Sequence, residues 1–361
     1  MSWKRLVLMT LLAGALVALV SCAELRYYSQ AALGQARLLV ARKPIERLLD
    51  EPATPPELRA KLTTVQRVRQ MAIDELGLPE NGSYTTFVEL KPIPPATERR
   101  FVTWNVVAAP ELSVVPVTWC FPVAGCVSYR GYFKRAAAER FAARLQDEGL
   151  DVSVGGVSAY STLGWFEDPV LSTFLRYPDL DLAGLLIHEL AHQVVYVTDD
   201  TVFNESFATA VELEGVRRWL EQEGAPTEAM ERYLEAQQRE EEFTELVLEV
   251  RERLDAAYRE EASEAEKRAW KAELFAELRD AYADLKASWG GDARYDAWFD
   301  RELNNAHLAS IGAYRDLVPA FQALLASHGG DLETFYTAVR DLAELEPEAR
   351  RAELEAQLPT D

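Results

Sequence analysis

Two of the chain's four histidines, His188 and His192, lie four residues apart, and this pair constrains fold and chemistry more than any other feature. Leu182 to Val197 carries apolar residues at helical spacing, after a helix-start signal at Pro178. On a helix, residues i and i+4 share a face, so both imidazoles can reach one ion. Glu189 follows the first histidine and could take a proton from a water molecule that the ion polarises.

A third ligand is expected a short distance along the chain. Twelve residues separate Glu205 from His192, enough for a corner and the start of an antiparallel helix. Glu212 lies two turns further along the same face and could accept a hydrogen bond from an imidazole N–H, and Asn204 is a second candidate for this supporting layer. Two histidines and a glutamate leave a fourth position open for water, as in a catalytic zinc site.

The pattern H-E-x-x-H followed by N-E-x-F-A-x-x-x-E resembles the gluzincin metallopeptidases, in particular the enzymes similar to aminopeptidase N. Residues 159–169, 204–208 and 303–306 extend the likeness over most of the mature chain, to a bacterial family of zinc-dependent aminopeptidases. The resemblance implies a peptide substrate and one zinc ion, with Glu189 as catalytic base. The implied zinc ligands are His188, His192 and Glu205.

Two departures from the aminopeptidase-N pattern leave the substrate open. Glu205 lies closer to His192 than the corresponding glutamate does in those enzymes, and the Gly-x-Met-Glu-Asn loop that holds a free α-amine there is absent. An aminopeptidase is the expected function. The alternatives are a zinc endopeptidase or amidase acting on periplasmic or cell-wall peptides, and a non-catalytic lipoprotein scaffold that keeps the site.

Two tyrosines are candidates for stabilising the oxyanion of a tetrahedral intermediate. Tyr160 lies in a strand-to-loop segment before the metal helix, and Tyr314 follows a late helical segment. Packing in the core is the simpler explanation for both. The two remaining histidines, His307 and His328, are expected on the surface.

Four polar side chains are candidates for holding the substrate. Glu167 and Asp168 could together bind a substrate ammonium, although such a pair more often caps the following segment. Asn304 and Asn305 could contact the peptide backbone, although helix packing is the commoner role for such residues.

Residues 1–21 have the form of a lipoprotein signal peptide. A positive start is followed by an apolar run over 6–20, which is too short for a secure membrane span, and by small residues before Cys22. The final Leu-Val-Ser-Cys resembles the lipobox of bacterial lipoproteins, which implies acylation of Cys22. Ala23 follows, and by resemblance to Gram-negative lipoproteins this favours the outer membrane, with the body facing the periplasm. An uncleaved single-pass anchor, or a secretory signal with an incidental cysteine, is the alternative.

The two other cysteines fit an oxidising compartment. Cys120 and Cys126 lie six positions apart, with Pro122 and Gly125 allowing the chain to turn between them. A disulfide is expected, and two buried free thiols are the alternative.

The mature chain, 22–361, is expected to form one metallopeptidase domain of the α+β class. Short β-favouring runs separated by proline-rich turns predict a small mixed sheet that precedes the metal helices, within a core over about 80–225. The region over about 226–361 carries dense charged faces at helical spacing. The expected architecture is therefore mostly helical, with gluzincin-like metal-site helices and a helical C-terminal half.

The net charge of −21 excludes some partners. Nucleic acid is not expected, because its phosphates need a basic footprint. The negative charge also disfavours a surface that lies on anionic lipid, so membrane attachment is expected through the N-terminal lipid. No sequence feature identifies a protein partner.

Overall fold

The computed structural model describes residues 24–92, 100–121, 125–159, 162, 166–311 and 317–358. The expected signal peptide over 1–21, Cys22, Tyr160 and Tyr314 lie outside these residues. Within the described residues, no helix is both long and apolar enough to cross a bilayer.

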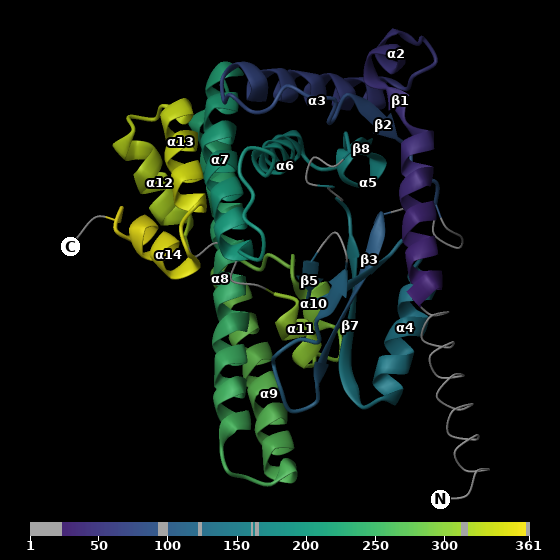
Figure 1. The fold of residues 1–361 in the computed structure, drawn as a ribbon, viewed down its shortest axis with the longest axis vertical. Helices are drawn as coiled ribbons and strands as arrows, with labels where there is room; N and C mark the ends of the chain where they lie inside the picture. The colour runs from purple at the N-terminus through teal and green to yellow at the C-terminus, as the bar shows by residue number, and fades with distance from the viewer. Residues whose placement is uncertain are drawn as a thin grey trace, which may run out of the picture.

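The chain folds as an α+β protein dominated by helices, as predicted (Figure 1). The main sheet has the strand order β6 (Arg130–Tyr132), β3 (Thr103–Pro110) and β7 (Leu150–Val157). β3 pairs antiparallel with both neighbours. Alternate residues of β3, namely Trp104, Val106 and Ala108, share a hydrophobic core with helix α4 (Arg135–Asp147), because successive side chains of a strand point to opposite faces.

Two smaller sheets complete the strands of the described part of the chain. One has the order β1 (Lys43–Pro44), β2 (Thr86–Val88) and β8 (Val170–Leu171), and the other is the hairpin of β4 (Trp119–Phe121) and β5 (Gly125–Val127). β2 pairs antiparallel with β1 and parallel with β8. Cys120 and Cys126 are partners in the hairpin and form a disulfide. All these strands precede the metal helices, as predicted.

Three helices build the layer that carries the predicted ligands. They are α3 (Pro56–Asp74), α6 (Asp179–Ala191) and α7 (Thr201–Gln222). α6 packs against both α3 and α7 (Figure 1). The close contact of α6 with α7 requires a glycine, because a Cβ on Gly215 would lie 2.9 Å from side-chain atoms of Ile187. On the other side of α7 lie α12 (Val318–Ser327), α13 (Leu332–Ala343) and α14 (Pro347–Glu355).

Helices α8 (Thr227–Arg259) and α9 (Glu264–Ser288) form a long hairpin below this layer (Figure 1). It has a hydrophobic core of its own, which includes Phe243, Val247 and Leu278. The short helices are α2 (Ile45–Asp50), α5 (Ser172–Leu175), α10 (Asp296–Phe299) and α11 (Asn305–Ala309). A further helix spans residues 24–41 and opens the described chain.

Asn304 and Asn305 both have hydrogen-bond partners within the fold, and their predicted contact with substrate stays a prediction. The Asn304 side chain caps α11 by accepting from the N–H of Ala306, and it donates to the carbonyl of Val152. Asn305 is fully buried. Its amide donates to the carbonyls of Pro110, Glu111 and Ser113, and its oxygen accepts from the Tyr258 hydroxyl. These bonds fasten α11 to the sheet and to α8.

His307 is buried, so the prediction that it lies on the surface was wrong, whereas His328 is half-buried. The His307 Nδ1 atom lies 2.9 Å from Oδ1 of Asn304, and Trp298 packs edge-on against the ring. Burial, and then the charge of Arg301, lower the pKa of His307 to about 4. The folded chain therefore keeps this imidazole neutral.

Acid should consequently weaken the fold through His307. In the unfolded chain the His307 imidazole has a pKa of about 6.5, so between pH 6.5 and about 4 the unfolded chain binds a proton that the folded chain does not. The stability that the neutral His307 contributes is therefore complete above pH 6.5 and is lost as the pH falls to about 4. The loss amounts to about 3 kcal/mol over this range. We expect urea unfolding of His307→Gln to depend less steeply on pH between 7 and 4. Parallel curves for variant and wild type would contradict this assignment.

Candidate metal centre

Helix α6 carries the two histidines one turn apart at its C-terminal end. Pro178 stands at its N-cap, and acidic Asp179 and Asp181 in its first turn favour the helix because they complement the positive end of the helix dipole. The helix ends at Ala191, so His192 is its C-cap residue. The spacing of four residues directs both imidazoles toward α7.

Glu205 enters the site from the first turns of α7. Asp200 caps that helix by accepting from the N–H of Phe203, and its carboxylate also pairs with Arg350. The Asn204 side chain donates to the carbonyl of Val197 and accepts from its N–H, at 2.7 and 2.8 Å. Asn204 therefore fixes the loop between the two metal helices, and within the described part of the chain its side chain makes no hydrogen bond to an imidazole.

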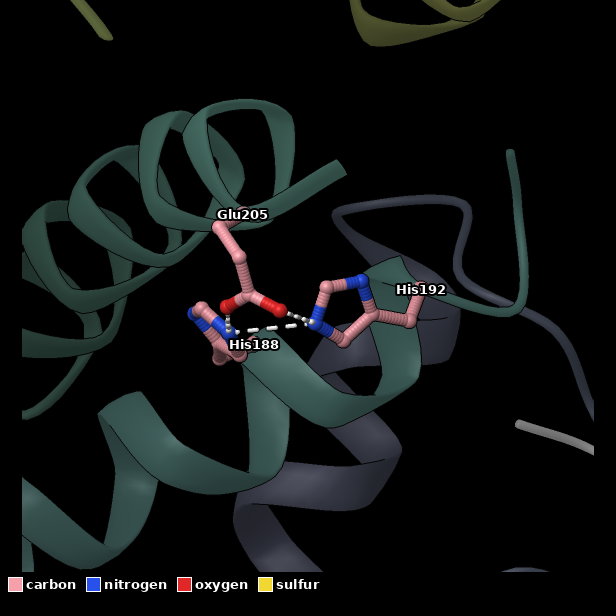
Figure 2. A group of neighbouring side chains, drawn as sticks. All are labelled: His188, His192 and Glu205. Carbon is pink, nitrogen blue, oxygen red and sulfur yellow. Dashed lines mark hydrogen bonds and ion pairs between the residues drawn. The ribbon is translucent and has the colours of Figure 1, made fainter. Parts of the chain in front are cut away.

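The three predicted ligands converge on one point (Figure 2). The Nε2 atoms of His188 and His192 are 3.2 Å apart. One Glu205 oxygen lies 3.2 Å from the first of these nitrogens, and the other oxygen lies 3.6 Å from the second. Donor atoms at zinc-ligand distance from one tetrahedral ion are themselves about 3.3 Å apart. The spacing of the three side chains therefore suits a metal ion.

Glu212 supports the site from behind. One of its oxygens lies 2.9 Å from Nδ1 of His188, and the other accepts from the Tyr233 hydroxyl at 2.5 Å. A carboxylate in this position orients the imidazole so that Nδ1 carries the proton and Nε2 is left for a metal. The predicted role of Glu212 therefore has matching geometry.

The electrostatics of the two imidazoles also suit a cation. Burial alone would lower the pKa of His188, but the carboxylates of Glu205 and Glu212 outweigh burial and raise it to about 10. Burial, and then the neighbouring His188, lower the pKa of His192 to about 4, so this imidazole is neutral. The site therefore attracts positive charge between one carboxylate and two Nε2 atoms, where a metal ion could replace a proton.

A cavity of ≈ 490 Å³ reaches one of the three ligands, His188. Glu189 lines it together with His188 and Glu212. Further along the wall stand Asp181, Glu240 and Arg294. Glu189 is half-buried. It directly follows the ligand His188 in the chain and lines this cavity.

A family model described as "Putative aminopeptidase" matches residues 26–354. The chain belongs to this family. No curated protein and no solved structure matches it. The family indicates a peptidase, and the partly buried group of His188, His192 and Glu205 could hold a metal ion.

Of the two acids predicted to bind a substrate ammonium in this aminopeptidase-family chain, Asp168 is buried and has structural partners. Its carboxylate accepts from the N–H and the hydroxyl of Thr162, both at 2.8 Å, and its carbonyl accepts from the N–H of Tyr84. Through these hydrogen bonds, Asp168 holds the segment before β8 to Thr162 and Tyr84. Glu167 is exposed.

Three tyrosines that interact with residues of the metal centre were not predicted from the sequence. Tyr233 reaches Glu212 only through the packing of α8, which no local spacing encodes. Tyr84 is buried, has a left-handed φ of 61°, and has its pKa raised by burial and by Glu189 and Asp168. Tyr196 packs edge-on at 6.4 Å from His192 and is half exposed. Its position four residues after His192 repeats the spacing of the two histidines, and that signal could have revealed it.

Removal of the Tyr233 hydroxyl should loosen Glu212 and weaken the metal site. We expect Tyr233→Phe to lower metal affinity by about 10- to 100-fold, the usual effect of losing a partner behind a ligand. Titration with zinc in a competing chelator measures this change. Tyr258→Phe is the matched control, because it removes another buried hydroxyl of α8 whose partner is Asn305. Equal zinc affinity in Tyr233→Phe and wild type would refute the role of this bond.

Proposed function

We propose that the chain is a zinc-dependent peptidase, and most specifically an aminopeptidase, that holds one Zn²⁺ ion through His188, His192 and Glu205. The convergence of two imidazole nitrogens and one carboxylate within tetrahedral spacing carries the proposal. Two nitrogens and an oxygen are a donor set that suits catalytic zinc. Membership of the aminopeptidase family supports a peptide as the substrate.

Glu189 is the proposed catalytic base. Zinc, when bound, would polarise the scissile carbonyl and lower the pKa of a water molecule to about 7. Glu189 follows a ligand on α6 and lines the cavity, so its carboxylate could take the proton of the attacking water and return it to the leaving amine. Its negative charge also contributes to the raised pKa values of His188 and Tyr84.

Metal analysis combined with a peptide panel tests the function. We expect one zinc ion per chain, cleavage of peptides with a free amino terminus, loss of cleavage in chelator and its return with zinc. Equal cleavage of N-blocked peptides would instead indicate an endopeptidase or amidase. Stoichiometric zinc without turnover of any peptide would refute the peptidase and favour a scaffold.

For the location, we propose a lipoprotein of the outer membrane that faces the periplasm. The signal-like sequence over 1–21 and Cys22 support this proposal. The Cys120–Cys126 disulfide is compatible with an oxidising compartment. Labelled palmitate should enter the wild-type chain and not Cys22→Ser, and outer-membrane fractions should contain only the former. Incorporation into both chains would refute acylation at Cys22.

A further inference from the structure

A basic groove lies between the helix over 24–41 and helix α4, far along the chain from the metal ligands. It encloses ≈ 580 Å³. In Figure 1 the purple first helix runs down toward α4. The groove is lined by six cationic residues, Arg26, Arg37, Arg130, Lys134, Arg140 and Arg144, and by one acidic residue, Glu24. In a chain with 59 acidic and 38 basic residues, this local excess of positive charge is the reverse of the overall balance.

The positive charge of the groove is largely uncompensated. The carboxylate of Glu24 forms an ion pair with the buried Arg130, whose guanidinium also stacks over the Tyr27 ring at 3.9 Å. The other five cations are exposed. Within the described residues, none of these five has a carboxylate oxygen within 4.0 Å, whereas basic residues such as Arg217 and Arg268 each pair with two carboxylates. The groove is therefore positively charged and can bind an anion from outside the chain.

Exposed apolar side chains accompany these cations on the first helix. Leu25, Leu33 and Val40 are 68%, 58% and 88% exposed. Arg26, Leu33 and Val40 follow one another at intervals of seven residues, or two helical turns, and so share a face. We call Leu25, Leu33 and Val40 the apolar stripe. A helix with cations beside exposed aliphatic residues has the composition of one that lies in a membrane interface.

We propose that the basic groove and the apolar stripe together dock on the membrane, with phosphate-bearing lipid headgroups in the groove and the stripe among the headgroups and upper acyl chains. Anionic lipid attracts each nearby Lys or Arg, and the remaining negative charge of the chain is screened beyond about 10 Å. Exposed aliphatic residues favour a bilayer over an acidic protein as the occupant, because a bilayer also takes up the stripe.

The docking surface lies where the proposed anchor would place it. This step rests on acylation of Cys22 and not on the peptidase activity. Two residue steps separate Cys22 from Glu24, a span of about 7 Å at most. That length is comparable to the headgroup layer on one side of a bilayer. An acylated chain would therefore bring the start of the first helix to the headgroups, and docking would fix the orientation of the body on the membrane.

The test uses the full-length acylated chain in vesicles of phosphatidylcholine, with or without phosphatidylglycerol. Ala36→Cys introduces a label site on the exposed surface of the first helix, and the native Cys120 and Cys126 are already paired. An environment-sensitive fluorophore at this site should be shielded from an aqueous quencher on anionic vesicles and remain accessible on neutral ones. Equal accessibility on both vesicles, or no association with anionic vesicles, overturns the proposal.

A triple variant then assigns the effect to the groove. The variant combines Arg37→Gln, Lys134→Gln and Arg140→Gln. It should have an equilibrium constant for docking on anionic vesicles about 100-fold lower than wild type, since each cation contributes a factor of about five. The matched control, Arg232→Gln, Arg251→Gln and Arg340→Gln, makes the same change in net charge on α8 and α13 and should dock like wild type. Equal losses in both triple variants would show that only net charge matters, and would overturn the assignment. A failed anchor would instead release the chain from neutral vesicles, which distinguishes the two proposals.

Discussion

Replacing Glu189 with glutamine is expected to stop peptide hydrolysis while the metal remains bound. The amide has nearly the shape of the carboxylate, so α6 and its two histidines should keep their positions. It cannot accept a proton from the attacking water, and general base catalysis contributes about 10²- to 10⁴-fold to the rate. We therefore expect kcat of Glu189→Gln to fall by about that factor. Zinc content and peptide turnover, measured on the same preparation, check both halves of this expectation.

A neighbouring carboxylate provides the control for Glu189. Asp181 lies two turns earlier on α6 and lines the same cavity, but it is not adjacent to a ligand. Asp181→Asn makes the same chemical change and should retain most of the turnover. Wild-type kcat in Glu189→Gln would show that another group takes the proton. Loss of zinc from this variant would show that Glu189 holds the site together instead.

The metal centre is the part of the molecule that local sequence patterns predict best. A spacing of four on a helix brings His188 and His192 together whatever the rest of the fold does. The short connection to α7 then limits where Glu205 can lie, and seven further residues place Glu212 behind His188. These positions depend only on helix geometry and a short loop, so they could be predicted from the sequence alone.

Contacts between distant segments could not be predicted in this way. Tyr233 meets Glu212 because α8 packs against α7, and Asn305 meets Tyr258 across forty-seven positions. Asn304 and Asn305 have the donors and acceptors of a substrate-binding pair, but Asn304 caps α11 and bonds the carbonyl of Val152, and the buried Asn305 donates to backbone carbonyls of the fold. The sequence identifies such polar groups without showing which will be satisfied internally.

Net charge does not describe how charge is distributed over the surface. A total of −21 disfavours a surface that lies on anionic lipid, yet five exposed cations gather on the first helix and on α4 with its N-cap, and none of them has a carboxylate partner among the described residues. Most of the excess acidic residues lie elsewhere, including the long α8–α9 hairpin. Screening restricts each charge to its own neighbourhood, so spatial arrangement decides what a surface attracts.

Glu205→Ala is expected to lose the metal as well as the activity. The variant keeps both histidines and the support of Glu212, but it removes the carboxylate that faces both Nε2 atoms. Loss of a direct ligand should exceed the 10- to 100-fold effect of losing a supporting partner, so zinc affinity should fall by more than about 100-fold. Equilibrium dialysis should then find stoichiometric zinc in wild type and little in the variant at the same free concentration.

Thermal unfolding separates loss of the metal from loss of the fold. A ligand at 100 times its Kd stabilises the folded state by about 2.7 kcal/mol, so zinc should raise the Tm of wild type but hardly that of Glu205→Ala. Glu214→Ala is the control, because Glu214 lies on the same helix and pairs with Arg217 and Arg218. Its zinc-dependent rise in Tm should match that of wild type, even if its metal-free Tm is lower. An equal rise in Glu205→Ala would show that this carboxylate does not bind the ion, and the proposed metal centre would have to be abandoned.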